Sequence, residues 1–222
     1  AEIWTVTAAA LACASRVVGN LAALVQDDVK RMLAYSSVSQ AGFLMIAVAA
    51  NNESGGSALL YFLIPYTAAT VGAFAVVSAR ERELGRPVDV ASLAGLGWER
   101  PLHGVAMWVF MLSFAGFPLT GGFLGKFTVF TAAYESGWWW LIVVGVVFTA
   151  VSIAYYMGIG RSMYMRSGSL DGTAPVAVGG SPRVDRALDL ALLAAIAVVV
   201  GSFFAVEPLF DLAADAIAQL PL

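Results

Sequence analysis

Lys126 is the side chain in this sequence whose position is best suited to carrying a proton. It lies inside the apolar run 103–134. As one helix this run would be about 48 Å long, against about 30 Å for the hydrocarbon core of a bilayer. A charge at membrane depth costs a few kcal/mol and burial disfavours the charged amine, so a lysine there can load and release a proton. The alternatives are a lysine that snorkels to an interface or one held in a static ion pair.

The same run is interrupted about two helical turns before Lys126, where residues 116–122 read GFPLTGG. Pro118 removes a backbone donor and clashes with the preceding turn, while Gly121 and Gly122 tolerate an unwound backbone. Unpaired backbone groups at membrane depth are tolerated only where protein or a wet cavity surrounds them. We therefore expect a helix broken at Pro118, with Lys126 on its second half.

Three polar residues of the second apolar run share one helical face. Ser36, Ser39 and Gln40 stand at positions i, i+3 and i+4, so in a lipid helix they must face other helices or water. Such a stripe can hold a chain of waters, or it can simply form hydrogen bonds between helices. Lys30 lies in the charged turn before this run. Arg16, near the middle of the first run, is expected to pair with a polar helix neighbour.

The composition places these residues in a membrane. The 222 residues are 60% hydrophobic and 12% charged, whereas soluble domains are about half apolar and a quarter charged. A net charge of −3 offers no basic face for nucleic acid. With Cys13 and His103 as its only cysteine and histidine, the chain cannot ligate an iron–sulfur cluster, a bis-histidine haem or a Cys/His zinc ion. Any linked redox chemistry must therefore take place on another chain.

The apolar runs predict the fold class. A bilayer-spanning helix needs about 20 residues, and continuous rather than alternating runs favour helices over a barrel. Six runs qualify, namely 3–25, 32–50, 57–78, 103–134, 137–165 and 187–210. The sequence therefore predicts an all-α integral membrane protein of about six transmembrane helices, of which the fourth is broken.

The charged turns predict the orientation. Apart from Arg16 and Lys126, every lysine and arginine falls on one side of these crossings. The charged residues on the opposite side are all acidic. By the positive-inside rule the cation-rich side is cytoplasmic. The cations are Lys30, Arg31, Arg80, Arg82, Arg86, Arg100, Arg161, Arg166, Arg183 and Arg186, and the acidic residues opposite are Glu2, Glu53, Glu135, Glu207, Asp211 and Asp215.

Two stretches resemble signature motifs of the antiporter-like membrane subunits of respiratory complex I. Residues 26–37, QDDVKRMLAYSS, are similar to the pattern Q-x-x-x-K-R-x-L-A-Y-S-S, and residues 116–127, GFPLTGGFLGKF, are similar to G-x-P-x-T-x-G-F-x-G-K-F. The resemblance covers essentially the whole chain and is nearest to the subunit N members of bacterial NADH:quinone oxidoreductase. It implies the C-terminal helices of a longer subunit, whose N-terminal half lies outside this sequence.

The resemblance also implies an internal organisation. Residues 1–165 would form the second of two inverted repeats, 166–186 a cytoplasmic loop, and 187–222 a closing transmembrane helix and tail. Broken helices at the midplane of inverted repeats are how many transporters build ion sites. Lys126 matches the lysine of the family's broken helix, which carries protons in models of the family.

The other residues that we expect along the proton path are Lys30, Ser36, Ser39 and Gln40, although the charges around Lys30 also fit a solvated turn. This chain departs from the family at two positions. Gln40 stands where many members have a histidine and cannot titrate, although a water held by Gln40 could substitute. Arg16 stands where an apolar residue is expected.

The function implied is proton translocation as a subunit of NADH:quinone oxidoreductase in the bacterial plasma membrane. NADH, flavin, iron–sulfur clusters and quinone would lie on partner subunits, and this chain would carry no cofactor, no metal and no catalytic residue of the redox reaction. Its partners would be the other membrane and peripheral subunits of complex I, the lipid bilayer and protons, with no nucleic acid.

Two other functions are compatible with parts of the sequence. A subunit of a multisubunit cation/proton antiporter or of a membrane-bound hydrogenase would share both motifs. The larger antiporter-like subunits usually carry His and Lys in the third helix, however, where residues 61–70 here read YFLIPYTAAT. A structural membrane scaffold that conducts nothing would gain nothing from a buried lysine beside a helix break. These features favour the complex I subunit.

Overall fold

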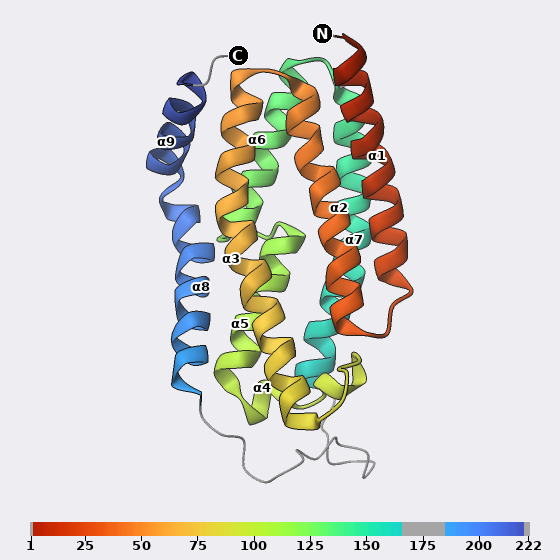
Figure 1. Cartoon of the computed structure of the whole chain (residues 1–222), viewed down its shortest axis with the longest axis vertical. Coiled ribbons are helices and arrows are strands. Elements are labelled where there is room, and N and C mark those ends of the chain that lie inside the picture. Colours follow the sequence, from red (N-terminus) through yellow and green to blue (C-terminus); the bar gives the residue numbers. More distant parts are fainter. Residues whose placement is uncertain (1, 166–184, 220–222) are drawn as a thin grey trace.

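The computed structural model describes residues 2–165 and 185–219, and these form a bundle of long helices that run side by side along one axis (Figure 1). The described helices are α1 Glu2–Leu24, α2 Val29–Ala50, α3 Glu53–Leu84, α4 Leu96–Glu99, α5 Pro101–Ala115, α6 Gly121–Glu135, α7 Trp139–Met165, α8 Arg186–Phe204 and α9 Val206–Ala218, with a short 3-10 turn at Ala91–Leu93. Helices α1, α2, α3, α7 and α8 are long and apolar enough to cross a membrane, and α5 is a shorter apolar helix. The prediction of an all-α membrane protein is confirmed.

The predicted helix break is confirmed as well. The run 103–134 is divided into α5, which ends at Ala115, and α6, which begins at Gly121. Between them Gly116 has φ 79° and Leu119 has φ 71°, two left-handed conformations that no regular helix contains. Together the two half-helices span the length of the bundle as a single crossing (Figure 1).

The last apolar run behaves differently from the prediction. The run 187–210 was expected to be one helix, but α8 ends at Phe204 and a separate helix, α9, begins at Val206. The physical reason is Pro208, which has no N–H to donate to the carbonyl of Phe204 four residues earlier. The tail is therefore a second helix, α9, which contacts α3.

Helix α3 is longer than the predicted run 57–78 because polar groups stabilise both of its ends. The side chain of Asn52 accepts a hydrogen bond from the Gly55 N–H at the start. At the other end, Glu81 pairs with Lys30 of α2. Capping and ion pairs of this kind extend a helix past the lipid boundary, where hydropathy no longer supports it.

Two apolar clusters fill the bundle, and the helix break separates them. One contains the buried side chains of α5, such as Phe110 and Phe114, with those of the second half of α3. The other contains the buried side chains of α6, such as Val129 and Ala133, with those of the first half of α3. Polar side chains that lie between the two clusters are thus enclosed by apolar groups on both sides.

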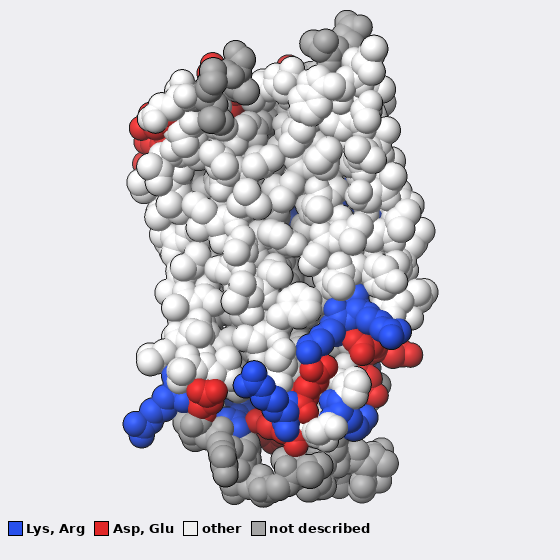
Figure 2. Space-filling view, viewed as in Figure 1, with Lys and Arg blue, Asp and Glu red and all other residues white. Residues whose placement is uncertain are grey.

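The described cations gather as predicted. Figure 2 shows lysine and arginine side chains collected at the end of the molecule where α2 begins and α3 ends. Acidic side chains accompany them there and also appear at the opposite end. Arg166 and Arg183 of the predicted cytoplasmic set lie outside the described residues, as does most of the predicted loop 166–186.

Candidate functional site

The Lys126 ammonium caps the end of the first half-helix. Lys126 lies in the second turn of α6 with 5% of its surface exposed, and its Nζ donates a hydrogen bond to the carbonyl oxygen of Phe114. In an unbroken helix that carbonyl would accept from the N–H four residues later. That residue is Pro118, which has no N–H. The proline thus leaves an acceptor free at membrane depth, and the lysine occupies it.

Glycines make this close arrangement possible. A side chain at Gly116 would meet Lys126, because an added Cβ would lie 2.9 Å from its Cδ. At Gly122 an added Cβ would lie 2.1 Å from the Ser113 carbonyl oxygen, and at Gly121 it would lie 2.0 Å from the Ser202 Oγ. Gly121 and Gly122 were expected to tolerate an unwound backbone. They are instead the first residues of α6, where they allow its start to approach α5 and α8 closely.

Gln40 binds the same carbonyl from the other side. Its Nε2 donates to the Phe114 oxygen at 3.1 Å and lies 3.4 Å from the Tyr156 hydroxyl. The Tyr156 hydroxyl is also hydrogen-bonded to the Ser36 Oγ. We call Lys126, the Phe114 carbonyl, Gln40, Tyr156 and Ser36 the lysine cluster. All of these residues are buried.

Arg16 is another buried cation and is 1% exposed. Its guanidinium donates to the Ser39 Oγ at 3.1 Å, the Gly145 carbonyl at 2.7 Å and the Thr149 Oγ1 at 2.9 Å. The prediction that Arg16 pairs with a polar helix neighbour is therefore confirmed. Ser39 belongs to this group rather than to the lysine cluster.

Asn20 extends the arginine network. Its amide donates to the Ser39 Oγ at 2.5 Å and to the Arg16 carbonyl at 2.8 Å. The Tyr155 hydroxyl in turn donates to the Asn20 Oδ1 at 3.1 Å. Since Tyr155 adjoins Tyr156 in the chain and their ring centroids are 4.5 Å apart, the two networks meet at this pair of tyrosines.

One phenyl ring contacts both cations. The Arg16 Cζ lies 5.3 Å from the centroid of the Phe43 ring, and the Lys126 Nζ lies 5.7 Å from it. Cations within about 6 Å of a ring centroid are attracted by the ring quadrupole. The fully buried Phe43 of α2 thus contacts a cation of the arginine network and the lysine of the lysine cluster.

The comparisons with known proteins identify the family of the chain. Residues 1–152 match the family model described as NADH:quinone oxidoreductase/Mrp antiporter, TM. The chain belongs to this family. Both resembling motifs, which led to the same family, lie within the matched residues.

Proteins from two kinds of assembly resemble the chain. NADH-quinone oxidoreductase subunit N of Salinibacter ruber is 40% identical over 206 residues, which are 90% of this chain and 41% of that protein. A chain of respiratory complex I from Thermus thermophilus with bound aureothin is 35% identical with a TM-score of 0.76, covering 91% of this chain and 44% of that one. A chain of the Mrp complex from Dietzia sp. DQ12-45-1b has a TM-score of 0.85 at 23% identity, covering 98% and 47% respectively, and this likeness shows the fold alone. The chain thus spans less than half the length of each of these proteins.

Lys30, the motif lysine of the family resemblance, lies apart from the lysine cluster. It is in the first turn of α2, and its partly exposed ammonium pairs with Glu81 of α3. Ten residues separate it from Gln40, which is about 15 Å along the helix. The structure therefore brings Lys126, Gln40 and Ser36 together, places Ser39 beside Arg16, and leaves Lys30 at the cation-rich end.

Sequence reasoning missed two members of the lysine cluster. The Phe114 carbonyl could have been found from Pro118, because a proline always leaves the carbonyl four residues earlier without its helical donor. Tyr156 gave only a weak signal, as one of two adjacent tyrosines in a long apolar run. The hydrogen bond between His103 and Asp189, at 3.2 Å between α5 and α8, was also missed. Within residues 2–165 and 185–219, no three His, Cys, Asp or Glu side chains come together to hold a metal ion.

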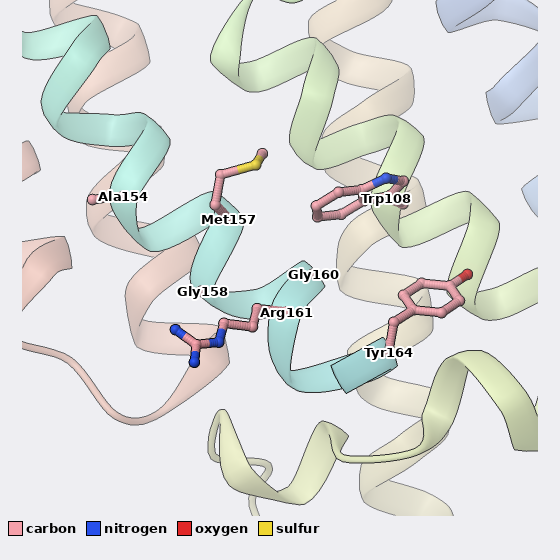
Figure 3. Close-up of a pocket in the computed structure, with 7 residues that line it drawn as sticks. All are labelled: Trp108, Ala154, Met157, Gly158, Gly160, Arg161 and Tyr164. Atoms are coloured by element: carbon pink, nitrogen blue, oxygen red, sulfur yellow. The ribbon is translucent and has the colours of Figure 1, made fainter. Parts of the chain in front are cut away.

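A groove on the outer side of α5 and α7 is separate from the lysine cluster. It has a volume of about 780 Å³ and is lined by Trp108, Met157, Arg161 and Tyr164, with the glycines of α7 between them (Figure 3). The Trp108 ring lies directly over Gly160, where an added Cβ would collide with it at 1.4 Å. No member of the lysine cluster lines this groove.

Proposed function

We propose that this chain carries protons across the membrane as a subunit of NADH:quinone oxidoreductase, with Lys126 as the group that loads and releases the proton. The observation that carries the proposal is the hydrogen bond from Lys126 to a carbonyl that the helix break leaves free. Among the described residues, no carboxylate forms an ion pair with Lys126. A carboxylate would hold the ammonium in a static pair, whereas a neutral carbonyl stabilises it without preventing release.

The neighbours of Lys126 are suited to both of its protonation states. When the amine releases its proton and its bond to Phe114 weakens, the Gln40 amide still donates to the same carbonyl and keeps that buried acceptor satisfied. Tyr156 and Ser36 carry hydroxyls that both donate and accept, so they can pass a proton along the cluster. Gln40 cannot titrate and acts by holding the Phe114 carbonyl and Tyr156 in place.

Lys30 has a different place in the proposed path. At the cation-rich end of α2 it would stand at the cytoplasmic entrance, together with Glu81. Protons would travel from there toward the polar face of α2 that carries Ser36, Ser39 and Gln40. The distance of about 15 Å between Lys30 and Gln40 requires water or other hydroxyls between them.

The proposal includes partners that supply the energy. The relatives from Salinibacter ruber and Thermus thermophilus support an assembly with the other membrane and peripheral subunits of complex I in the bacterial plasma membrane. NADH, flavin, iron–sulfur clusters and quinone would be bound by those subunits. This chain has one cysteine and one histidine, Cys13 and His103, which cannot supply the four ligands of a cluster. Its own contribution is proton transfer through the membrane.

The proposal is tested with Lys126→Ala in the full complex, in inverted membrane vesicles. We expect the complex to assemble, because alanine is well accommodated in a lipid helix, and proton uptake driven by NADH and quinone to fall sharply. Electron transfer from NADH to an artificial acceptor that bypasses quinone should continue at the wild-type rate, which controls for assembly. Wild-type proton uptake by assembled Lys126→Ala enzyme would exclude Lys126 as the carrier.

A cation/proton antiporter is the second candidate, because the Dietzia Mrp chain has the same fold with a TM-score of 0.85. The two functions differ in their driving force. A complex I subunit moves protons when NADH is oxidised, with or without sodium, whereas an antiporter exchanges protons for a cation in the absence of NADH. Proton movement on a sodium pulse without NADH would favour the antiporter.

A further inference from the structure

Arg16 carries a charge that its own hydrogen bonds do not require. Its partners are a serine hydroxyl, a threonine hydroxyl and a backbone carbonyl, all neutral. In the part of the chain that the structure describes, no carboxylate pairs with it, and its buried Nε has no hydrogen-bond partner. Buried charges are normally paired with an opposite charge, since their desolvation is expensive. An unneutralised positive charge thus stands inside the bundle.

This charge is close to Lys126. Both cations contact the Phe43 ring, at 5.3 Å for the Arg16 Cζ and 5.7 Å for the Lys126 Nζ. Their separation cannot exceed the two distances together, which is about 11 Å. Both cations and the Phe43 ring are buried, so the repulsion between the two charges is screened less than it would be in water.

We propose that Arg16 is a positioning residue for proton transfer, a fixed positive charge that opposes the loaded ammonium of Lys126 and thereby promotes release of its proton. The inference rests on the proposed function of Lys126 and assigns a second residue to the same site. Arg16 touches neither the proton nor the Phe114 carbonyl. It acts through the electrostatic field that it produces at the Lys126 ammonium.

The size of the effect follows from Coulomb's law. Two unit charges about 11 Å apart, at an effective dielectric constant of about 20, change an equilibrium constant about tenfold. Arginine suits this role better than lysine would, since its guanidinium stays charged at every physiological pH. A cation that cannot release its own proton favours release only from its neighbour.

Thr149 offers a test that leaves Arg16 in place. The Thr149 Oγ1 lies 2.9 Å from the guanidinium, so Thr149→Asp puts a carboxylate against Arg16 and cancels its charge. The equilibrium between protonated and neutral Lys126 then shifts about tenfold toward the protonated form, and release of the proton slows. In inverted vesicles with the full complex, we expect Thr149→Asp to lose most of the uptake that Lys126→Ala loses. The matched variant Thr149→Asn has nearly the same shape without the charge and should retain wild-type uptake.

A second pair of variants changes Arg16 itself. Arg16→Gln keeps hydrogen-bonding groups near Ser39 and removes the charge. Arg16→Lys keeps a positive charge but loses the planar guanidinium with its several N–H donors. If the charge matters, Arg16→Lys should retain more uptake than Arg16→Gln, although less than the wild type because a buried lysine can lose its own proton, and Arg16→Gln should lose about as much as Thr149→Asp. If Arg16 is only a hydrogen-bonding group, Arg16→Gln should be the milder change.

The outcomes separate this inference from the function on which it rests. Reduced uptake in Lys126→Ala together with wild-type uptake in Thr149→Asp would overturn the role of Arg16 and leave Lys126 as the carrier. Equal losses in Thr149→Asp and Thr149→Asn would also overturn it, because the cause would then be shape and not charge. Wild-type uptake in Lys126→Ala would overturn both. Should Arg16→Gln fail to assemble, the Thr149 pair alone decides.

Discussion

At the scale of single residues, the lysine cluster depends on a carbonyl that proline leaves without a donor. Lys126 and Gln40 both donate to the Phe114 oxygen, and Gln40 links it to Tyr156. Lys126 and Gln40 are recognisable in the sequence by their residue types, since a charge and an amide stand out in an apolar run. Tyr156 could not be recognised in this way, because tyrosines are common in membrane helices and only the packing of α7 against α2 brings this hydroxyl to Ser36.

The hydroxyl of Tyr156 gives a prediction at this scale. Tyr156→Phe removes the hydroxyl that bonds Ser36 and Gln40 while keeping the ring that packs on Phe114. We expect the complex to assemble and proton uptake to fall about five- to tenfold, the kinetic equivalent of one lost hydrogen bond of about 1 kcal/mol. Proton uptake by vesicles measures this, with Tyr134→Phe on the exposed face of α6 as the matched control. Equal rates in both variants would remove Tyr156 from the path.

At the scale of elements, the broken helix positions the site. The sequence predicted the break because proline and glycine act locally, through a missing donor and a missing side chain. It did not predict that Gly121 and Gly122 lie inside α6, because close approach between helices depends on packing that a local pattern does not contain. The end of α8 at Phe204 was missed for another reason. The sequence stays largely apolar through Pro208, but the backbone hydrogen bonding of the helix is interrupted there.

Gly122 gives a prediction for this element. An added Cβ would lie 2.1 Å from the backbone oxygen of Ser113, which cannot move without displacing the end of α5. We expect Gly122→Ala to lower the free energy of unfolding by about 1–3 kcal/mol through overpacking, and to reduce the amount of assembled complex. Gly158→Ala in α7 is the matched control, because an added Cβ there has no neighbour within 4 Å. Native gels of solubilised membranes would show the difference, and equal assembly of the two variants would contradict the packing account.

At the scale of the whole molecule, two charge distributions are superimposed. One gathers most of the described cations at the end where α2 begins, which the positive-inside rule predicts to be cytoplasmic (Figure 2). The other places Arg16 and Lys126 between apolar clusters in the middle. The first was predictable from a count of lysine and arginine between spans. The contact of both Arg16 and Lys126 with the Phe43 ring was not predictable. Residues 16, 43 and 126 lie on three helices, and only the fold determines which helices meet.

The orientation is tested by labelling. In a Cys13→Ser background, a cysteine at Arg86 should react with an impermeant maleimide only from the cytoplasm, and a cysteine at Glu53 only from the opposite side, since α3 separates these positions. Intact cells and inverted vesicles expose the two sides in turn. Labelling of both positions from one side would overturn the predicted topology.

The central claim is that Lys126 moves a proton and does not merely stabilise the broken helix. Lys126→Arg tests it most directly, because arginine keeps a donor and a charge for the Phe114 carbonyl but cannot release its proton at any physiological pH. The measurement is the number of protons taken up per NADH oxidised by inverted vesicles, normalised to assembled complex. We expect a clear fall below the wild-type ratio with assembly intact. An unchanged ratio in Lys126→Arg would show that Lys126 only caps α5 and that the proton takes another path.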